Sequence, residues 1–373
     1  MKKATLSTSE RIALIQSVGE DIVGLDELLS LLESDEDLVC YDGMEPSGRL
    51  HIAQGTMRAI NTNKMIKAGF CFKFYVADWF AFLNNKLEGD LEKIHTAGEY
   101  FIEIWRSCGM DLGGVEFVWA SELIKQDGYW ELVMKTANNS TLKRILRCTQ
   151  IMGRNEEEKL LASQILYPCM QATDIFMLKA QVAQLGMDQR KVNMLARTIS
   201  EEIGMKKPII VSNHMLMGLL KSNGNIADPI EKAISMKMSK SKPDSAIFMD
   251  DPKEEIHRKI MKAYCPEGII ELNPILEYCK YIIFESAHLK GREELLKNGF
   301  HIKRLEKFGG DVVYKTYEEL EKDYSEKKLY PLDLKVAVIE YLNSLLEPVR
   351  KHFESNADAA SLMEAVNGYN ITR

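Results

Sequence analysis

The sequence predicts an α/β fold in which a doubly wound parallel sheet forms the first domain and helices form the second. Apolar strand-like segments alternate with amphipathic segments through residues 37–213, as in β-α-β units. Helical periodicity replaces this alternation after about residue 250. The 373 residues exceed one average domain of about 150 residues. We therefore divide the chain into an α/β domain at 1–235, a loop at 236–250 and a helical domain at 251–373.

Each element of this fold follows from its own local pattern. Short runs rich in apolar and β-branched residues predict strands at 37–43, 72–82, 115–121, 182–188 and 207–213. Helical spacing of apolar residues predicts helices at 8–22, 25–33, 51–70, 90–109, 122–160 and 189–204. The helical domain is expected to contain helices at 251–265, 272–284, 317–326 and 332–354.

Composition limits the classes of function. A net charge of −7 argues against a protein that coats nucleic acid with its whole surface, whereas the basic segments 141–154, 257–262 and 301–307 remain candidates for RNA contact. Seven cysteines without a CxxC pair favour free thiols in a reducing compartment over disulfides or a zinc site. No segment has the ~18 apolar residues of a membrane span, and no secretory signal is visible. We expect a cytoplasmic protein.

A strand, a Pro/Gly turn and a helix start follow one another in CYDGMEPSGRLHIAQG, residues 40–55. A helix N-terminus suits phosphate, because it offers unpaired N–H groups and the positive end of the helix dipole. His51 can donate to phosphate oxygens there, and small residues such as Gly55 let a flat ligand approach the backbone. The same pattern is also compatible with a helix cap or a surface histidine.

Three polar side chains share one helical face in LYPCMQATDIF, residues 166–176. Tyr167, Gln171 and Asp174 are spaced by four and three residues, and Pro168 fits the first position of a helix. Each polar tip needs a partner if this face is buried. The partner is either a bound ligand or another group of the protein.

The strand expected at 182–188 ends in a second polar turn. Gly186 is followed by Asp188 and Gln189. Ligands of open parallel sheets bind at the carboxyl ends of the strands, where an aspartate commonly accepts hydrogen bonds from ribose hydroxyls. This turn alone is a weak signal.

The segment ISMKMSKSKPDSAIFMDD, residues 234–251, has neither a helix period nor a strand period. It is either a solvated linker or a mobile clamp whose lysines close on a polyphosphate. KMSKS at 237–241 lies after the last expected strand and at the domain junction, which favours the clamp.

Together these residues resemble the class I aminoacyl-tRNA synthetases. Residues 51–54 are similar to the HIGH motif of that class, with Ala53 and Gln54 in place of Gly and the second His, and 237–241 match KMSKS without change. More narrowly, the chain resembles the tyrosyl enzymes of the archaeal and eukaryotic branch from about residue 37 to 353. This resemblance implies a Rossmann-like catalytic domain and a helical anticodon-binding domain.

The resemblance also implies an activity and its site. Tyrosine would react with ATP, accompanied by Mg²⁺, to give tyrosyl-adenylate and pyrophosphate, and the tyrosyl group would pass to the 3′ end of tRNA(Tyr). The implied L-tyrosine contacts are Tyr41, Tyr167, Gln171, Asp174 and Gln189. The implied catalytic residues are His51, Gln54, Lys237 and Lys240. The implied ATP contacts are Gly43, His51, Gly55, Gly186, Asp188, Met238, Ser239 and Lys240. No protein metal site is expected.

The second domain and the insertion carry the remaining implications. EKFGGD and YPLDLK resemble anticodon-binding motifs, which place Phe308 and Asp333 against the first anticodon base; Tyr330 stands where His is common. An aromatic platform and a carboxylate acceptor suit an unstacked guanine. The resemblance further implies a homodimer, with its interface in the insertion at about 120–160.

Three alternatives stay open. A tryptophanyl enzyme shares both motifs, but an indole N–H needs a single acceptor, which does not account for Asp174 together with Tyr41. A non-catalytic RNA-binding paralogue has no use for His51 and KMSKS. A small nucleotidyltransferase needs no helical domain with Phe308 and Asp333.

Overall fold

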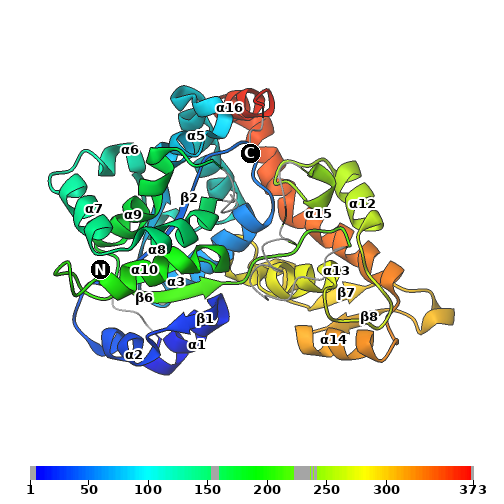
Figure 1. Ribbon diagram of the computed structural model, residues 1–373. Coiled ribbons are helices and arrows are strands. Elements are labelled where there is room, and N and C mark those ends of the chain that lie inside the picture. Colours follow the sequence, from blue (N-terminus) through cyan, green and yellow to red (C-terminus); the bar gives the residue numbers. More distant parts are fainter. Residues whose placement is uncertain (1–5, 153–158, 222–235, 237, 239–241, 371–373) are drawn as a thin grey trace.

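The computed structural model describes residues 6–152, 159–221, 236, 238 and 242–370. A six-stranded sheet lies at its centre, in the order β1-β6-β5-β2-β3-β4 (Figure 1). The strands are β1 (Gly19–Val23), β2 (Val39–Met44), β3 (Cys71–Val76), β4 (Val115–Trp119), β5 (Val182–Gly186) and β6 (Ile209–Asn213). Neighbouring strands from β6 to β4 are parallel, and only β1 pairs antiparallel, with β6. The doubly wound sheet predicted from the sequence is confirmed, with one antiparallel edge strand added.

Helices cover both faces of this sheet. They are α1 (Thr8–Val18), α2 (Leu25–Glu33), α3 (Arg58–Lys67), α4 (Asp78–Leu83), α5 (Leu91–Cys108), α6 (Ala120–Leu123), α7 (Tyr129–Asn138), α8 (Leu142–Cys148), α9 (Ala162–Met177) and α10 (Arg190–Ile199). Successive residues of β2 point to opposite faces. Cys40 packs in the core that contains α3 and α5, and Tyr41 packs in the core that contains α9 and α10.

The strand order reverses between β2 and β5, which pair with each other through Cys40 and Val182. From β2 the chain proceeds outward to β3 and β4 on one side, and from β5 to β6 on the other. Such a reversal leaves a crevice outside the carboxyl ends of the two strands, where ligands of open α/β sheets bind. The fold therefore places the candidate site at the end of β2 and β5.

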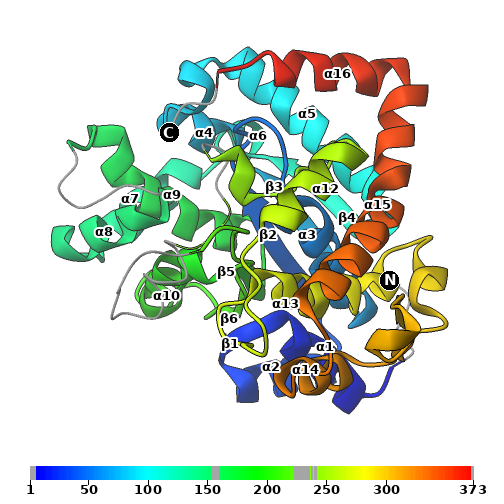
Figure 2. The ribbon, with the colours of Figure 1, turned by 90° about the vertical axis from the view of Figure 1, so that its right-hand side faces the viewer.

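The C-terminal part is mainly helical. It contains α12 (Lys253–Lys262), α13 (Pro274–Tyr278), α14 (Tyr317–Ser325), α15 (Pro331–Ser355) and α16 (Ala357–Asn367). Two short strands, β7 (Phe300–Ile302) and β8 (Val312–Tyr314), pair antiparallel within this mainly helical part. α15 runs back to α5, where α16 also packs (Figure 2).

Several element boundaries differ from the sequence-based expectation, and four differences change the description of the fold. The helix expected at 8–22 ends at Val18, because the next five residues pair with β6 as strand β1. The strand expected at 72–82 ends at Val76, and α4 follows it. Pro168 lies inside α9, which begins at Ala162, and is not at a helix start. The segment 122–160 was expected to be helical throughout, but it contains several short helices, and residues 153–158 lie outside the described residues.

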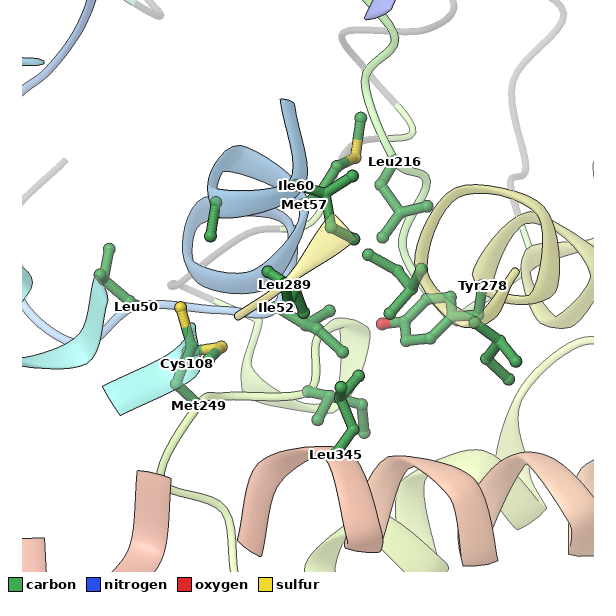
Figure 3. Close-up of a cluster of buried hydrophobic side chains, with 14 of the residues drawn as sticks. Leu50, Ile52, Met57, Ile60, Cys108, Leu216, Met249, Tyr278, Leu289 and Leu345 are labelled. Atoms are coloured by element: carbon green, nitrogen blue, oxygen red, sulfur yellow. The ribbon is translucent and has the colours of Figure 1, made fainter. Parts of the chain in front are cut away.

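The two parts share buried side chains. Ile52 before α3, Tyr278 of α13 and Leu345 of α15 belong to one apolar cluster, together with Leu289 (Figure 3). Each of these side chains is at most 2 % exposed. Burial of this kind favours a fixed arrangement of the two parts, because separation would expose a contiguous apolar surface to water.

Two further findings concern the part of the chain that the structure describes. None of its helices is both long and apolar enough to cross a membrane. All seven cysteines are free thiols, and five of them are buried.

Candidate active site

The inner end of the candidate site is a carboxylate surrounded by phenol groups. Asp174 comes from α9, Tyr41 from β2 and Tyr129 from the first turn of α7. Tyr129 donates a hydrogen bond from its hydroxyl to Asp174 Oδ1, at 2.7 Å. All three side chains are buried. The structure thus brings Tyr41 and Asp174 together, as the sequence predicts, and adds Tyr129.

The oxygen atoms at this end that lack a hydrogen-bond partner among the described residues include Tyr41 Oη and Asp174 Oδ2. Burial raises the pKa of Asp174 well above its usual range, while the hydroxyls of Tyr129 and then Tyr75 act in the opposite direction. Burial, followed by the nearby Asp174 carboxylate, also raises the pKa of Tyr41. Buried polar atoms are nearly always hydrogen-bonded in folded proteins. Unpartnered oxygens on residues that interact electrostatically therefore indicate a ligand with a polar group at this point.

The outer end of the site carries polar side chains from the same helix. Gln171 donates to Gln189 Oε1 at 3.0 Å, and Gln189 donates to the carbonyl of Ile151 at 3.3 Å. Tyr167 donates to Glu45 Oε1 at 2.6 Å. The three helical residues predicted from their spacing thus share a buried face. In this structure Tyr167 and Gln171 are satisfied by protein groups, whereas Asp174 retains one unpartnered oxygen.

Glu45 is a site residue that the sequence reading missed. Its carboxylate also accepts from Asn84 Nδ2, at 3.1 Å and 3.2 Å to its two oxygens. Glu45 directly follows β2, at the strand end where ligands of this sheet type bind. Its position one residue beyond the strand was the signal that could have identified it.

Acidic side chains lie at the ends of β2 and β5, on the next side of the site. Asp42 is buried and forms an ion pair with Arg58 at the start of α3. Burial raises the pKa of Asp42 to about 6, against the lowering effect of Arg58. Across the strand reversal, Asp188 lies in the turn after β5. A Cβ atom on Gly186 would come within 2.7 Å of the Asp188 carboxylate, so glycine allows that side chain to fold back over the strand end.

The segment that resembles HIGH is fixed by the chain that follows KMSKS. Ile52 N–H donates to the carbonyl of Ile247, and Met249 N–H donates to the carbonyl of Leu50. His51 and Phe248 form the β-bridge between them. This pairing joins two motifs almost 200 residues apart, and it places residue 248 beside the start of the helix.

Gly55 and Gln54 have packing roles in this structure. A Cβ atom on Gly55 would lie 2.4 Å from Met249 Sδ, so Met249 fills the space that the sequence reading left for a flat ligand. The carbonyl of Gln54 accepts a hydrogen bond from Trp105 Nε1 at 3.0 Å. Gln54 Oε1 is buried without a hydrogen-bond partner among the described residues.

Most of the KMSKS motif lies outside the described residues, including Lys237, Ser239 and Lys240. Met238 is described, and its side chain is buried. Its Sδ atom lies 3.9 Å from the Tyr278 hydroxyl oxygen. The resemblance implied an ATP contact at Met238. The structure instead places this side chain in the apolar core.

The chain after this motif is anchored by ion pairs. Arg49 binds Asp250 at 2.6 Å and Asp251 at 3.1 Å. Lys259 of α12 binds Asp251 at 2.6 Å, and both side chains are nearly fully buried. Lys259 therefore cannot contribute to an exposed RNA-binding patch at 257–262, which corrects that part of the sequence reading.

The predicted anticodon residues lie at one edge of the helical part. Phe308 is half exposed, and its ring centroid is 6.5 Å from that of Tyr330. Tyr330 immediately precedes α15, and Asp333 lies in the first turn of that helix. Two exposed aromatic rings near the start of the helix that carries Asp333 form a surface suited to an unstacked base.

No group of three or more His, Cys, Asp or Glu side chains among the described residues has the spacing of a metal site.

Comparisons with known proteins agree with this geometry. Residues 33–347 match the family model described as tRNA synthetases class I (W and Y). The cytoplasmic tyrosine–tRNA ligase 1 of Arabidopsis thaliana is 50% identical over 98% of this chain and 90% of its own length. The tyrosine–tRNA ligase of Saccharolobus solfataricus is 41% identical over 98% and 99%.

Solved structures give the same result. A Leishmania major tyrosyl-tRNA synthetase in complex with tyrosinol has a TM-score of 0.86 and 43% identity over 98% of this chain, which spans 61% of that longer chain. The Pyrococcus horikoshii tyrosyl-tRNA synthetase complexed with L-tyrosine has a TM-score of 0.87 and 37% identity, over 96% of this chain and all of that one. The matches cover the sheet, the Asp174 region and the helical part alike. The chain therefore belongs to the tyrosyl-tRNA synthetases, within the class I tRNA synthetases.

Proposed function

We propose that this chain activates L-tyrosine with ATP and transfers the tyrosyl group to tRNA(Tyr). In the first step, a carboxylate oxygen of tyrosine bonds to the α-phosphorus, the bond from that phosphorus to the bridging oxygen breaks, and pyrophosphate leaves. In the second step, a ribose hydroxyl of the terminal adenosine attacks the tyrosyl carbonyl carbon, and AMP leaves with the bonding electron pair. Both steps depend on positioning and on stabilised charge, which the protein can supply without a covalent intermediate.

The observation that carries this proposal is the unpartnered pair of Tyr41 Oη and Asp174 Oδ2. A phenol hydroxyl entering between them donates to the carboxylate and accepts from Tyr41. Phenylalanine would leave both groups buried and unsatisfied. A site built around a substrate hydroxyl therefore rejects the analogue that lacks it.

The other end of the amino acid faces Tyr167, Gln171 and Gln189. Amide oxygens and a phenol can accept hydrogen bonds from the α-ammonium group. The Glu45 carboxylate beside Tyr167 provides negative charge for the same group. Tyrosine bound in this orientation has its carboxylate directed towards the strand ends, where the nucleotide binds.

ATP would occupy the crevice at the ends of β2 and β5. Asp188 would accept from the ribose, with Gly43 and Gly186 at the strand ends, and His51 would donate to the phosphates. Lys237 and Lys240, which lie outside the described residues, would close on the β- and γ-phosphates. Mg²⁺ would enter with ATP as its counter-ion, since Mg²⁺ is commonly held by substrate phosphates together with water.

The helical part would recognise the tRNA anticodon. Phe308 would stack on the first anticodon base, and Asp333 would accept from a guanine edge. This gives the proposed division into a catalytic domain at 1–235, a KMSKS loop at 236–250 and an anticodon-binding domain at 251–373. Buried apolar contacts between the parts support their fixed spacing.

A homodimer and a cytoplasmic location complete the proposal. On α7, Trp130 and Met134 are 47% and 59% exposed, and Leu142 on α8 is 62% exposed. Exposed apolar side chains gathered on neighbouring helices are typical of an interface. The cytoplasmic Arabidopsis relative supports the location. Sedimentation of the wild type and of Met134→Glu tests the dimer, which the variant should dissociate.

The Asp174→Ala variant tests the assigned recognition. We expect KM for tyrosine to rise far more than KM for ATP in pyrophosphate exchange, because Asp174 contacts only the amino acid. Asp111→Ala serves as the control, since Asp111 precedes β4 at the opposite end of the sheet. Equal increases in both KM values for Asp174→Ala would contradict the assignment.

A further inference from the structure

Tyr75 lies on β3, on the same face of the sheet as Tyr41. The parallel register pairs Tyr75 with Gly43 and pairs Tyr41 with Lys73, so the two tyrosines are diagonal neighbours on adjacent strands. A Cβ atom on Gly43 would come within 3.3 Å of Tyr75 Cβ and 3.4 Å of its ring. Glycine at position 43 therefore leaves room for the Tyr75 ring beside β2.

The ring of Tyr75 is held in place, and its hydroxyl is buried. Phe80 of α4 packs edge-on against it, with ring centroids 6.0 Å apart. The Tyr75 side chain belongs to the same buried core as Tyr41 and Tyr129. Burial, followed by the Asp174 carboxylate, raises the pKa of Tyr75. The hydroxyl thus lies within electrostatic reach of the carboxylate at the inner end of the site.

Tyr75 Oη has no hydrogen-bond partner among the described residues, like Tyr41 Oη and Asp174 Oδ2. These three oxygens belong to residues of one buried cluster, and each would be costly to leave unsatisfied. A phenol hydroxyl has one proton to donate and two lone pairs to accept with. It can therefore satisfy all three atoms at once: the proton goes to Asp174, and the lone pairs accept from Tyr41 and Tyr75.

We propose that Tyr75 is a third specificity residue, whose hydroxyl donates a hydrogen bond to the phenol oxygen of the bound tyrosine. This inference rests on the proposed function. In this arrangement the substrate hydroxyl donates its proton to Asp174 and accepts from Tyr41 with one lone pair. The second lone pair accepts from Tyr75. Phenylalanine then leaves three buried oxygens without a partner, so discrimination against it is stronger than two groups provide.

The Tyr75→Phe variant tests this role. We expect kcat/KM for tyrosine in pyrophosphate exchange to fall roughly tenfold, the scale of one lost hydrogen bond, while kcat/KM for phenylalanine stays the same or rises. The selectivity ratio therefore falls. The midpoint of thermal unfolding of the free enzyme should change little, because the removed hydroxyl makes no well-formed hydrogen bond and only approaches Asp174. The increase in midpoint on adding tyrosine should shrink.

Tyr100→Phe is the matched control. Tyr100 on α5 also has a buried hydroxyl without a hydrogen-bond partner among the described residues. Its ring packs against Phe353, in a different core from Tyr41 and Tyr75. This control should keep the wild-type selectivity ratio. The Tyr75 proposal is overturned if Tyr75→Phe keeps that ratio too, or lowers kcat/KM for both amino acids equally. Failure of the wild type itself to use tyrosine would instead overturn the proposed function, and this inference with it.

Discussion

Tyr129 offers a test of how the site is organised. Its hydroxyl donates to Asp174 Oδ1 at 2.7 Å, and both side chains are buried. Tyr129→Phe removes this bond but keeps the ring. A hydrogen bond to a charged group contributes about 1.5–3 kcal/mol, and this range corresponds to a factor of roughly 10 to 150 in kcat/KM. We expect a loss of this size for tyrosine and an unchanged KM for ATP.

The pH dependence separates positioning from a purely structural role. The Tyr129 hydrogen bond lowers the pKa of Asp174, against the raising effect of burial. Its removal should raise that pKa further, so the acidic limb of kcat/KM for tyrosine should move to higher pH. If Tyr129 had only a structural role, Tyr129→Phe would lower the stability of the protein without moving the acidic limb of kcat/KM for tyrosine.

Tyr324→Phe provides the matched control for this experiment. Tyr324 of α14 also donates a hydrogen bond from a buried ring, to the carbonyl of Pro266 at 2.8 Å. Its loss should lower stability and leave the tyrosine profile unchanged. The reasoning is refuted if a folded Tyr129→Phe enzyme keeps both the wild-type kcat/KM and the wild-type acidic limb. It is equally refuted if tyrosine and ATP recognition fall together.

Three further predictions concern other parts of the molecule. Lys259→Met should lower the free energy of unfolding by about 3–5 kcal/mol in chemical denaturation, because it leaves the Asp251 carboxylate buried without its cation; a loss below about 1 kcal/mol would contradict this. Burial lowers the pKa of His214, but Glu20 and Glu277 on either side of it more than offset burial and raise that pKa to about 9. Protonated His214 should therefore add about 2 kcal/mol to the free energy of unfolding, after allowing for the half-exposed Glu20. This contribution should be complete below pH ~6.5 and lost as the pH rises through about 9. His214→Gln should lack this pH dependence in chemical denaturation. Asp333→Ala should keep pyrophosphate exchange and weaken tRNA charging, and loss of both would contradict the division of labour.

The sequence was most informative where its patterns were periodic. Alternation of strands and helices predicted the sheet. The spacing of Tyr167, Gln171 and Asp174 predicted one shared helical face, which the structure shows to be buried. Strand β1 was missed because GEDIV has no apolar alternation and is stabilised by pairing with β6. β7 and β8 have only three residues each, which is too short for a periodic signal.

The unpredicted parts of the site depend on tertiary contacts. Tyr129 reaches Asp174 across 45 residues, and no local pattern encodes that contact. The β-bridge between His51 and Phe248 is equally remote in sequence. Met238 reads as part of a polar loop, but tertiary packing places it against Tyr278. Sequence motifs therefore identified the chemistry, and the structure identified the groups that orient it.

The most direct test of the account is pyrophosphate exchange with the purified chain, offered tyrosine, tryptophan and phenylalanine separately. The account predicts exchange with tyrosine alone, because only a phenol satisfies the unpartnered oxygens around Asp174. Exchange with tryptophan, or comparable exchange with phenylalanine, would contradict the proposed recognition of the substrate's phenol hydroxyl. Absence of exchange with all three in a folded sample that binds tRNA would contradict the proposed catalysis.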